Sequence, residues 1–320
     1  MITATQLREA MGLRTNESIL NYLDNLENSD TFSYKRGRQQ VLEPKFFQHY
    51  LKSSRKNRIN DFSNKIVSIA NNKGGVGKTS TSALLAYKAS DMGYKTVVLD
   101  SDPQGNLTNY LLGEDFEPEF CLYDIFKGNC TIEEALVKVN DFLYILPSTL
   151  DNEFISEAVS AVALPRMLNS HIIQKVDASL FVVDTNPSLS DMNLAIHSIA
   201  DLVLTVINND SSSVKGLKHV LAKLEQLGYE GSIKAVFNKI DGRENLKNAI
   251  ERINPLVENY NFTFCSKSIG IDSEIKNAQY NKNGAISIMD ANSKCQTDAL
   301  AVTIEILTDL ANSTIQENLQ

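Results

Sequence analysis

The residues best suited to chemistry form one short stretch, Lys73-Gly74-Gly75-Val76-Gly77-Lys78-Thr79-Ser80. Its end matches the phosphate-binding pattern G-x-x-x-x-G-K-[ST], although Asn72 stands where that pattern opens with glycine. Glycines let backbone N–H groups close around phosphate oxygens, a lysine placed like Lys78 reaches the β- and γ-phosphates, and a hydroxyl placed like that of Thr79 binds Mg²⁺. The stretch predicts a nucleotide site with one extra lysine, Lys73.

Three aspartates follow apolar runs elsewhere in the chain. Asp100 and Asp102 close "VVLDSD", and Asp184 ends "SLFVVD". Carboxylates at the carboxyl ends of parallel strands can hold Mg²⁺ through water or orient an attacking water. Helix capping or turn formation is the alternative for Asp100 and Asp102, because the segment contains Asp-Pro and Gln-Gly.

The elements that must position these residues alternate along the chain. Short apolar segments such as "KIVSIAN", "KTVVLDSD", "FLYILPS", "ASLFVVDTN", "DLVLTVIN", "IKAVFNKID" and "FTFCSKSI" read as strands. Helices are predicted at about 78–92, 214–227, 245–258 and 297–311. Strands that are apolar throughout and separated by helices indicate an α/β fold, a doubly wound and mostly parallel sheet covered on both faces. The glycine-rich stretch follows a buried strand and opens a helix, as a phosphate loop must.

Length and charge divide the chain in two. The 320 residues carry a net charge of −8, yet residues 1–60 contain ten Lys/Arg and six Asp/Glu, about +4, which leaves about −12 for the remainder. We predict a small domain at 1–60 and a P-loop domain at 61–320, joined at the polar "SSRKNRINDFSN". The four cysteines form no C-x-x-C pair, and neither a signal-peptide layout nor a membrane-length apolar run is present, so a cytoplasmic protein is expected.

The segments "KGGVGKTS", "VVLDSDPQGNLT", "LFVVDTNPSL" and "ILPSTLD" resemble the deviant Walker A ATPases, and among them the ParA family of plasmid and chromosome partition ATPases. The resemblance extends over about residues 64–312 and implies ATP and Mg²⁺ as cofactors. It further implies that Lys73 reaches across an ATP-sandwich homodimer to the partner's phosphates, where a cation would neutralise charge on the transferred phosphoryl group.

The resemblance also assigns roles to single residues. Lys73, Lys78 and Asp102 are the expected catalytic residues, and Thr79, Asp184 and Asp100 the expected Mg²⁺ residues, with Asp184 at the Walker B position. Residues 73–80 and Asn238 are expected to bind the nucleotide. The family segment D-T-P-P-S reads "DTNPS" here, so Asn186 departs from it in the second switch region.

A late strand ends in a pattern with two readings. Asn238, Lys239 and Asp241 spell N-K-x-D, which reads guanine in GTPases, whereas the family has D-x-R at a similar place, here ending in Arg243. We favour ATP. Relatives bind DNA non-specifically through arginines, one of which matches Arg243, while Glu274 stands at the second place with Lys276 nearby.

Residues 1–60 resemble a winged helix-turn-helix. A helix, a turn at Gly12 and a second helix precede a hairpin rich in Lys35, Arg36 and Arg38, and another helix follows. This layout is similar to the operator-binding module of larger plasmid ParA proteins, with a helix in the major groove and a basic wing on the backbone. A small helical dimerisation module is the alternative.

The sequence thus predicts a DNA-partition ATPase. ATP would drive dimerisation, the dimer would bind nucleoid DNA, and a centromere-binding partner of the ParB type would stimulate hydrolysis and release. No basic C-terminal helix of the membrane-cycling relatives is seen in "ANSTIQENLQ", so no membrane partner is expected. A nucleotide-gated transcriptional repressor and a cargo-positioning ATPase that uses the nucleoid as a track are the competing hypotheses.

Overall fold

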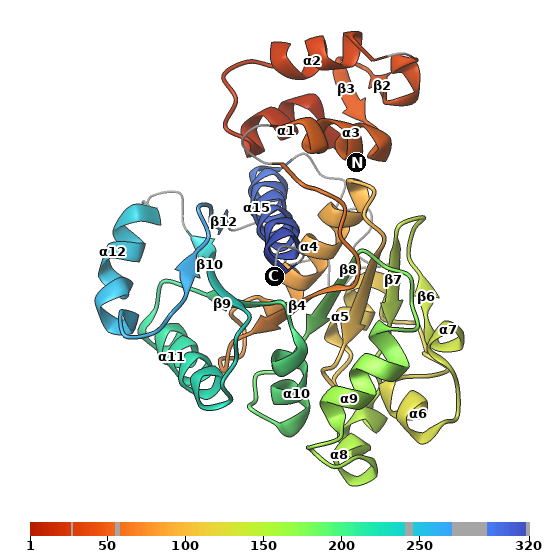
Figure 1. Ribbon diagram of the computed structural model, residues 1–320, viewed down its shortest axis with the longest axis vertical. Helices are drawn as coiled ribbons and strands as arrows, with labels where there is room; N and C mark the ends of the chain where they lie inside the picture. The colour runs from red at the N-terminus through yellow and green to blue at the C-terminus, as the bar shows by residue number, and fades with distance from the viewer. Residues whose placement is uncertain (27, 55–57, 241–245, 271–292, 318–320) are drawn as a thin grey trace.

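A computed structural model of the chain describes residues 1–26, 28–54, 58–240, 246–270 and 293–317. Its main unit is an α/β domain, a mostly parallel sheet with helices on both faces (Figure 1). The strands of the described chain are β1 Ile2–Thr3, β2 Ser33–Arg36, β3 Gln39–Leu42, β4 Lys65–Ala70, β5 Thr96–Asp100, β6 Val137–Lys138, β7 Leu143–Leu146, β8 Leu180–Asp184, β9 Leu202–Ile207, β10 Ser232–Ile240, β11 Thr263–Phe264 and β12 Ile269–Gly270.

The main sheet has the order β11-β10-β9-β4-β8-β5-β7-β6, and β12 pairs with the end of β10. The pairings are parallel except that β6 runs antiparallel to β7. Strand β4, which leads into the glycine-rich stretch, lies centrally between β8 and β9. The carboxyl ends of β4, β5, β8, β9 and β10 therefore meet at one edge of the sheet.

The helices complete the layers. They are α1 Ala4–Ala10, α2 Glu17–Asp24, α3 Pro44–Ser53, α4 Lys78–Asp91, α5 Asn106–Leu112, α6 Leu122–Lys127, α7 Ile132–Ala135, α8 Ile155–Ala158, α9 Leu164–Leu168, α10 Asp191–Ile199, α11 Ser211–Gln226, α12 Leu246–Val257 and α15 Lys294–Glu317.

Alternate residues of each strand explain the two covered faces. In β4, Val67 and Ile69 pack with α4, α5 and α15, whereas Ile66 and Ala70 belong to a separate cluster with α6 to α10. Because successive side chains of a strand point to opposite faces, a strand that is apolar throughout must be covered on both. The fold class predicted from the sequence is confirmed.

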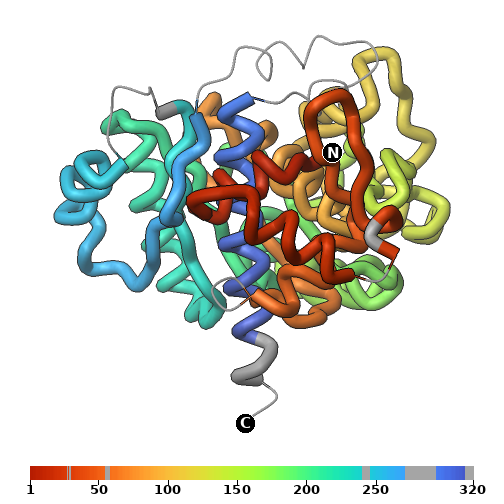
Figure 2. The backbone as a smooth tube through the Cα atoms, turned by 90° about the horizontal axis from the view of Figure 1, so that it is seen from above, coloured from red at the N-terminus to blue at the C-terminus, as the bar shows by residue number. Residues whose placement is uncertain are grey.

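Residues 1–54 form a small module with a second sheet, β1-β3-β2, around α1, α2 and α3. The module is not a separate globule. Its buried Leu7, Phe46 and Leu51 belong to the same hydrophobic cluster as α4 and α15, and α1 contacts α15. Seen from above, the module lies over α15 (Figure 2).

Specific contacts join the module and its connecting segment to the α/β domain. The Gln48 side chain donates a hydrogen bond to the Gly93 carbonyl at 3.1 Å, and the ring of Phe62 stacks on Tyr94 with centroids 5.3 Å apart. Tyr94 and Gly93 directly follow the end of α4. Helix α4 thus runs from the glycine-rich stretch to the module.

Most predicted elements are present with shifted ends. The last helix, predicted at 297–311, runs as α15 from Lys294 to Glu317. The predicted strand "FTFCSKSI" is two short strands, β11 and β12, on either side of an irregular stretch. The small helices α5 to α10 were not predicted, because each is too short to show a helical repeat of apolar residues.

Candidate functional site

The glycine-rich stretch forms a tight loop between β4 and α4. Gly75 and Gly77 have φ angles of +73° and +99°, in the left-handed region that glycine adopts without strain. A Cβ atom on Gly77 would also collide with the side-chain amide of Asn238. The loop ends as the N-terminal cap of α4, where free N–H groups and the helix dipole favour a phosphate group.

Lys78 begins α4 and its side chain turns back over the loop. Its Nζ lies 3.5 Å from the Lys73 carbonyl oxygen. Burial lowers the pKa of Lys78, and the negative charges of Asp184 and Asp102 oppose that shift. A largely buried ammonium group that faces two carboxylates, beside the first turn of a helix, is well placed to bind phosphate oxygens.

Asp184, at the end of β8, lies beneath the first turns of α4. Its carboxylate accepts hydrogen bonds from Thr79 Oγ1 at 2.8 Å and from Ser82 Oγ at 2.7 Å. Burial raises the pKa of Asp184 to about 6, although both hydroxyls act in the opposite direction. A hydroxyl and a carboxylate 2.8 Å apart beside a phosphate loop are the oxygen donors that Mg²⁺ takes together with phosphate oxygens and water.

Asp100 and Asp102 lie at the end of the neighbouring strand, β5. Both oxygens of Asp100 accept hydrogen bonds, from the Thr108 backbone and hydroxyl at 2.8 Å and from the Asp102 backbone at 3.2 Å. Burial, and then the charge of Asp184, raise the pKa of Asp100 to about 8. Asp100 therefore organises the turn that carries Asp102, and its predicted contact with Mg²⁺ stays a prediction.

Asp102 borders a cavity of about 720 Å³. Asn186, Ser188 and Asn193 also line it. The Asn193 amide donates to Asn186 Oδ1 at 2.8 Å and to the Ser188 carbonyl at 2.8 Å, so this one side chain holds together the loop that follows β8. Asn186, the departure from the family segment, is thus built into that loop.

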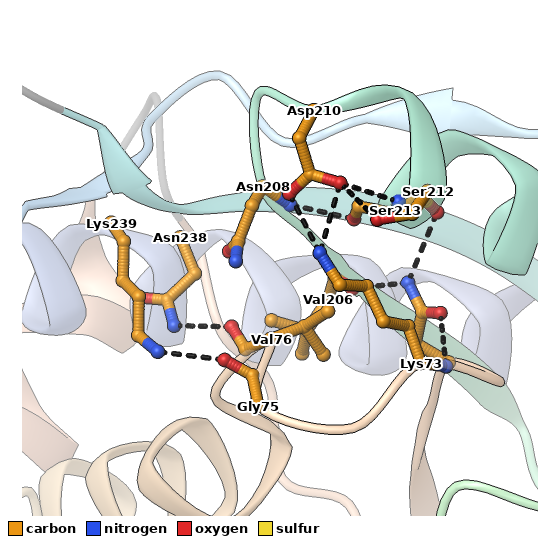
Figure 3. Close-up of polar contacts among 11 residues, drawn as sticks. Lys73, Gly75, Val76, Val206, Asn208, Asp210, Ser212, Ser213, Asn238 and Lys239 are labelled. Carbon is orange, nitrogen blue, oxygen red and sulfur yellow. Dashed lines mark hydrogen bonds and ion pairs between the residues drawn. The ribbon is translucent and has the colours of Figure 1, made fainter.

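Lys73 binds an aspartate of its own chain. Its ammonium group lies 2.9 Å from both carboxylate oxygens of Asp210, which caps the N-terminus of α11 through the Ser213 backbone at 2.8 Å (Figure 3). Partial burial alone would raise the pKa of Asp210, but hydrogen bonds from Ser212, Lys73 and Ser213 lower it to about 2. The side chain of Lys73 is 31% exposed, so it lies at the mouth of the loop and within reach of solvent.

Asn238 and Lys239 approach the loop from the end of β10. The Asn238 amide donates to the Val76 carbonyl at 2.8 Å, and Lys239 Nζ donates to the Gly75 carbonyl at 2.7 Å (Figure 3). Asn238 is 5% exposed and was predicted to bind the nucleotide. The structure places it against the loop backbone. Asp241, the fourth residue of the N-K-x-D pattern, lies outside the described residues.

The predicted DNA-binding residues fall into two groups. Lys35, Arg36 and Arg38 are exposed on the β2–β3 hairpin of the N-terminal module. Arg243 and Lys276, together with Glu274, lie outside the described residues. Helix α2, which follows the turn, carries Glu17 and Asp24 and has no lysine or arginine in its sequence.

Sequence reasoning missed three residues that the site brings together. Ser82 lies three residues after Thr79 on α4, a spacing that puts both hydroxyls on one helix face. Asp210 precedes "SSS" at a helix start, which is a capping signal at the correct edge of the sheet. Lys239 was noticed only as part of a base-reading pattern. The contacts of the three residues with Asp184, Lys73 and Gly75 had no local signal, because these partners lie more than a hundred residues away.

Comparisons with known proteins show which family the chain is similar to. A family model described as an AAA domain matches residues 64–239. The chromosome-partitioning ATPase Soj of Thermus thermophilus is 30% identical over 161 residues, which cover 50% of this chain and 61% of Soj. The matches to the first curated relatives cover 61% to 66% of their length.

Solved structures share the fold. A plasmid partition protein of Borrelia burgdorferi has a TM-score of 0.60 at 20% identity, over 77% of this chain and 98% of that one. The septum site-determining protein MinD of Pyrococcus horikoshii, complexed with Mg-ADP, has a TM-score of 0.61 at 23% identity, over 76% and 95%. The chain belongs to this AAA-domain family, and the curated proteins similar to it include Soj, ParA and MinD. Among the described residues no helix has both the length and the apolar character needed to cross a membrane.

Proposed function

We propose that this chain is a partition ATPase that binds ATP with Mg²⁺, dimerises around it, and hydrolyses it slowly. The observation that carries the proposal is the placement of the two lysines of the loop. Lys78 is buried over the chain's own phosphate loop, whereas Lys73 lies partly exposed at its mouth and is held by Asp210. The two lysines have different environments, as expected if one serves the chain's own ATP and the other a partner's.

The residues of the chain would divide the chemistry as follows. Backbone N–H groups of residues 75–79 and the Lys78 ammonium group would bind the phosphates. Thr79 and Asp184 would hold Mg²⁺, whose charge would neutralise that of the β- and γ-phosphates. Asp102, whose negative charge acts on Lys78, would orient the attacking water. Lys73, once released from Asp210, brings a positive charge to the phosphoryl group in the facing protomer.

DNA is the proposed ligand of the ATP-bound dimer. The exposed Lys35, Arg36 and Arg38 on the hairpin support a contact with phosphates in the N-terminal module, and Arg243 and Lys276 are proposed for the ATPase domain. A partner of the ParB type would stimulate hydrolysis and release the DNA. Localisation at the nucleoid follows from this proposal.

A nucleotide-gated repressor is the second candidate. The turn between α1 and α2 and the basic hairpin favour it, because they match the layout of a winged helix-turn-helix. The acidic Glu17 and Asp24 on α2 argue against strong, phosphate-driven binding by that helix. In this candidate the ATPase domain senses the nucleotide and the module reads an operator.

The proposal is tested by measuring how the full chain binds random-sequence DNA with ATP-Mg²⁺, with ADP and without nucleotide. We expect dimers and salt-sensitive DNA binding with ATP only, and loss of both in Lys78→Ala and Lys73→Ala. The triple charge reversal Lys35→Glu, Arg36→Glu, Arg38→Glu then separates the candidates: it should weaken partition-type binding in part but abolish operator binding. Binding confined to one operator sequence, in any nucleotide state, would favour the repressor. ATP-dependent dimers that never bind DNA would contradict both the partition and the repressor candidates. They would also contradict the cargo-positioning hypothesis, which requires binding to nucleoid DNA.

A further inference from the structure

The backbone of the phosphate loop is held from outside by the end of a distant strand. Lys239 Nζ and Asn238 Nδ2 donate to the carbonyls of two consecutive residues, Gly75 at 2.7 Å and Val76 at 2.8 Å. The Asn208 amide nitrogen, in the orientation that satisfies its neighbours, lies 3.1 Å from the Val76 carbonyl and 3.1 Å from the Asn238 carbonyl. Asn238 and Lys239 of β10 thus hold two consecutive peptide groups (Figure 3), and Asn208, which directly follows β9, adds a third contact.

These hydrogen bonds also fix the direction in which the N–H group of each of the two peptides points. In a planar trans peptide the carbonyl and the following N–H point in opposite directions. Holding the carbonyls of Gly75 and Val76 toward β10 therefore turns the N–H groups of Val76 and Gly77 away from β10, into the hollow of the loop. Successive N–H groups that converge in this way form an anion-binding nest.

The local backbone of β10 is adapted to this contact. Lys239 has a φ of +56°, which is uncommon for a residue with a side chain. The pairing of β10 with β12 shifts register between Asn238 and Ile240, so the irregularity is centred on Lys239. Such irregularities re-aim a side chain next to functional sites. Here the strand bends so that two consecutive side chains, Asn238 and Lys239, both reach the loop.

We propose that Asn238 and Lys239 are positioning residues that hold the phosphate loop ready for the β- and γ-phosphates of the nucleotide. The inference rests on the proposed function in one respect, the identity of the ligand. It also gives the first two residues of the N-K-x-D pattern a role that does not depend on which base is bound. Lys239 acts through the Gly75 carbonyl and not on the phosphates.

The experiment uses the full chain and the variants Lys239→Met, Lys239→Arg and Asn238→Ala, with Lys175→Met as the control. Lys175 is exposed and precedes β8, at the edge of the sheet opposite the loop. Dissociation constants are measured for ATP, ADP and GTP. Hydrogen–deuterium exchange of the peptide spanning residues 72–79 is followed without nucleotide, and the melting temperature is recorded.

We expect Lys239→Met to weaken ATP and ADP binding by about tenfold, the loss of one charged hydrogen bond. The ratio of ATP to GTP affinity should not change. Exchange in the loop should rise, Lys239→Arg should restore both properties, and the melting temperature should stay the same because the side chain is exposed. Asn238→Ala should act in the same direction, with some loss of stability because Asn238 is buried.

Two results would overturn the inference. In the first, Lys239→Met has the same loop exchange and the same nucleotide affinities as Lys175→Met. In the second, Lys239→Met changes the ratio of ATP to GTP affinity and leaves loop exchange unchanged, which would assign Lys239 to binding of the base. Failure of the proposed function looks different. It appears in the unsubstituted chain as an absence of ATP-dependent dimers, whereas the exchange measurement reads the loop without any nucleotide.

Discussion

Lys73 and Asp210 form an ion pair that joins the mouth of the phosphate loop to the start of α11, with both carboxylate oxygens 2.9 Å from the ammonium group. The two side chains are 31% and 41% exposed. Ion pairs at such exposure contribute only about 0–1 kcal/mol. The pair can therefore hold Lys73 in the monomer and still be exchanged for a phosphate group.

The first prediction separates the charge of Asp210 from its role as a helix cap. Asp210→Asn keeps a good capping side chain but removes the charge, so Lys73 is freed and ATP-dependent dimerisation should strengthen by up to about fivefold. Asp210→Ala should in addition lose about 1 kcal/mol of folding stability. Light scattering against ATP concentration and thermal melting measure the two effects. If Asp210→Asn behaves the same with and without Lys73→Ala, the ion pair has no part in dimerisation.

The second prediction concerns the two hydroxyls on Asp184. Thr79→Ala should lower Mg²⁺-dependent ATP hydrolysis by tenfold or more, roughly the effect of losing one Mg²⁺ contact, whereas Thr79→Ser should retain it. Ser82→Ala leaves a buried carboxylate oxygen without its partner and should cost about 1–3 kcal/mol of folding stability. Its Mg²⁺ dependence should stay close to that of the unsubstituted chain. Measuring hydrolysis against Mg²⁺ concentration, together with denaturant unfolding, distinguishes the two variants. If Thr79→Ala and Ser82→Ala changed the Mg²⁺ dependence of hydrolysis equally, the assignment of Thr79 as the Mg²⁺ residue would be contradicted.

The third prediction is a pH dependence. His197 on α10 lies 2.7 Å from Ser68 Oγ on β4, and burial lowers the pKa of His197 to about 4. Between pH 6.5 and 4 the unfolded chain binds a proton at this position and the folded chain does not, so stability falls as pH falls through this window. The loss approaches roughly 3 kcal/mol at pH 4.

Denaturant unfolding at a series of pH values measures this loss. His197→Gln removes the titrating group, so the difference in unfolding free energy between the two proteins isolates it from the buried carboxyls of the site. Parallel pH profiles for the two proteins would show that His197 does not titrate as its burial implies.

The fourth prediction tests the shared core. Phe46 is fully buried in the N-terminal module, with its ring stacked on Tyr50 at a centroid distance of 5.2 Å. Phe46→Ala should cost about 3–5 kcal/mol. Because the module and helices α4 and α15 share one cluster, calorimetry should show a single transition displaced to lower temperature. A separate early transition, with the ATPase-like domain still melting at the original temperature, would show two independent units.

Sequence patterns predicted the elements that depend on local spacing. The strand–loop–helix order follows from an apolar strand that runs into glycines, and the position of Asp184 follows from the end of another apolar run. The structure has both in these positions, and the roles of the residues stay predictions. The contacts of Lys73 and Lys239 could not be predicted in this way. Each lysine meets a group more than a hundred residues away, Asp210 or Gly75, and only the order of strands brings those groups together.

The shared core has a geometric consequence for DNA. Because the module is packed against α4 and α15, closure of two chains around ATP would set the separation of the two basic hairpins as well as the contact between the two phosphate sites. Symmetric DNA-binding dimers require half-sites at the matching distance along the duplex. If the proposed dimer binds an operator, nucleotide binding would therefore select operator sites by the spacing between their half-sites, whatever sequence each hairpin contacts.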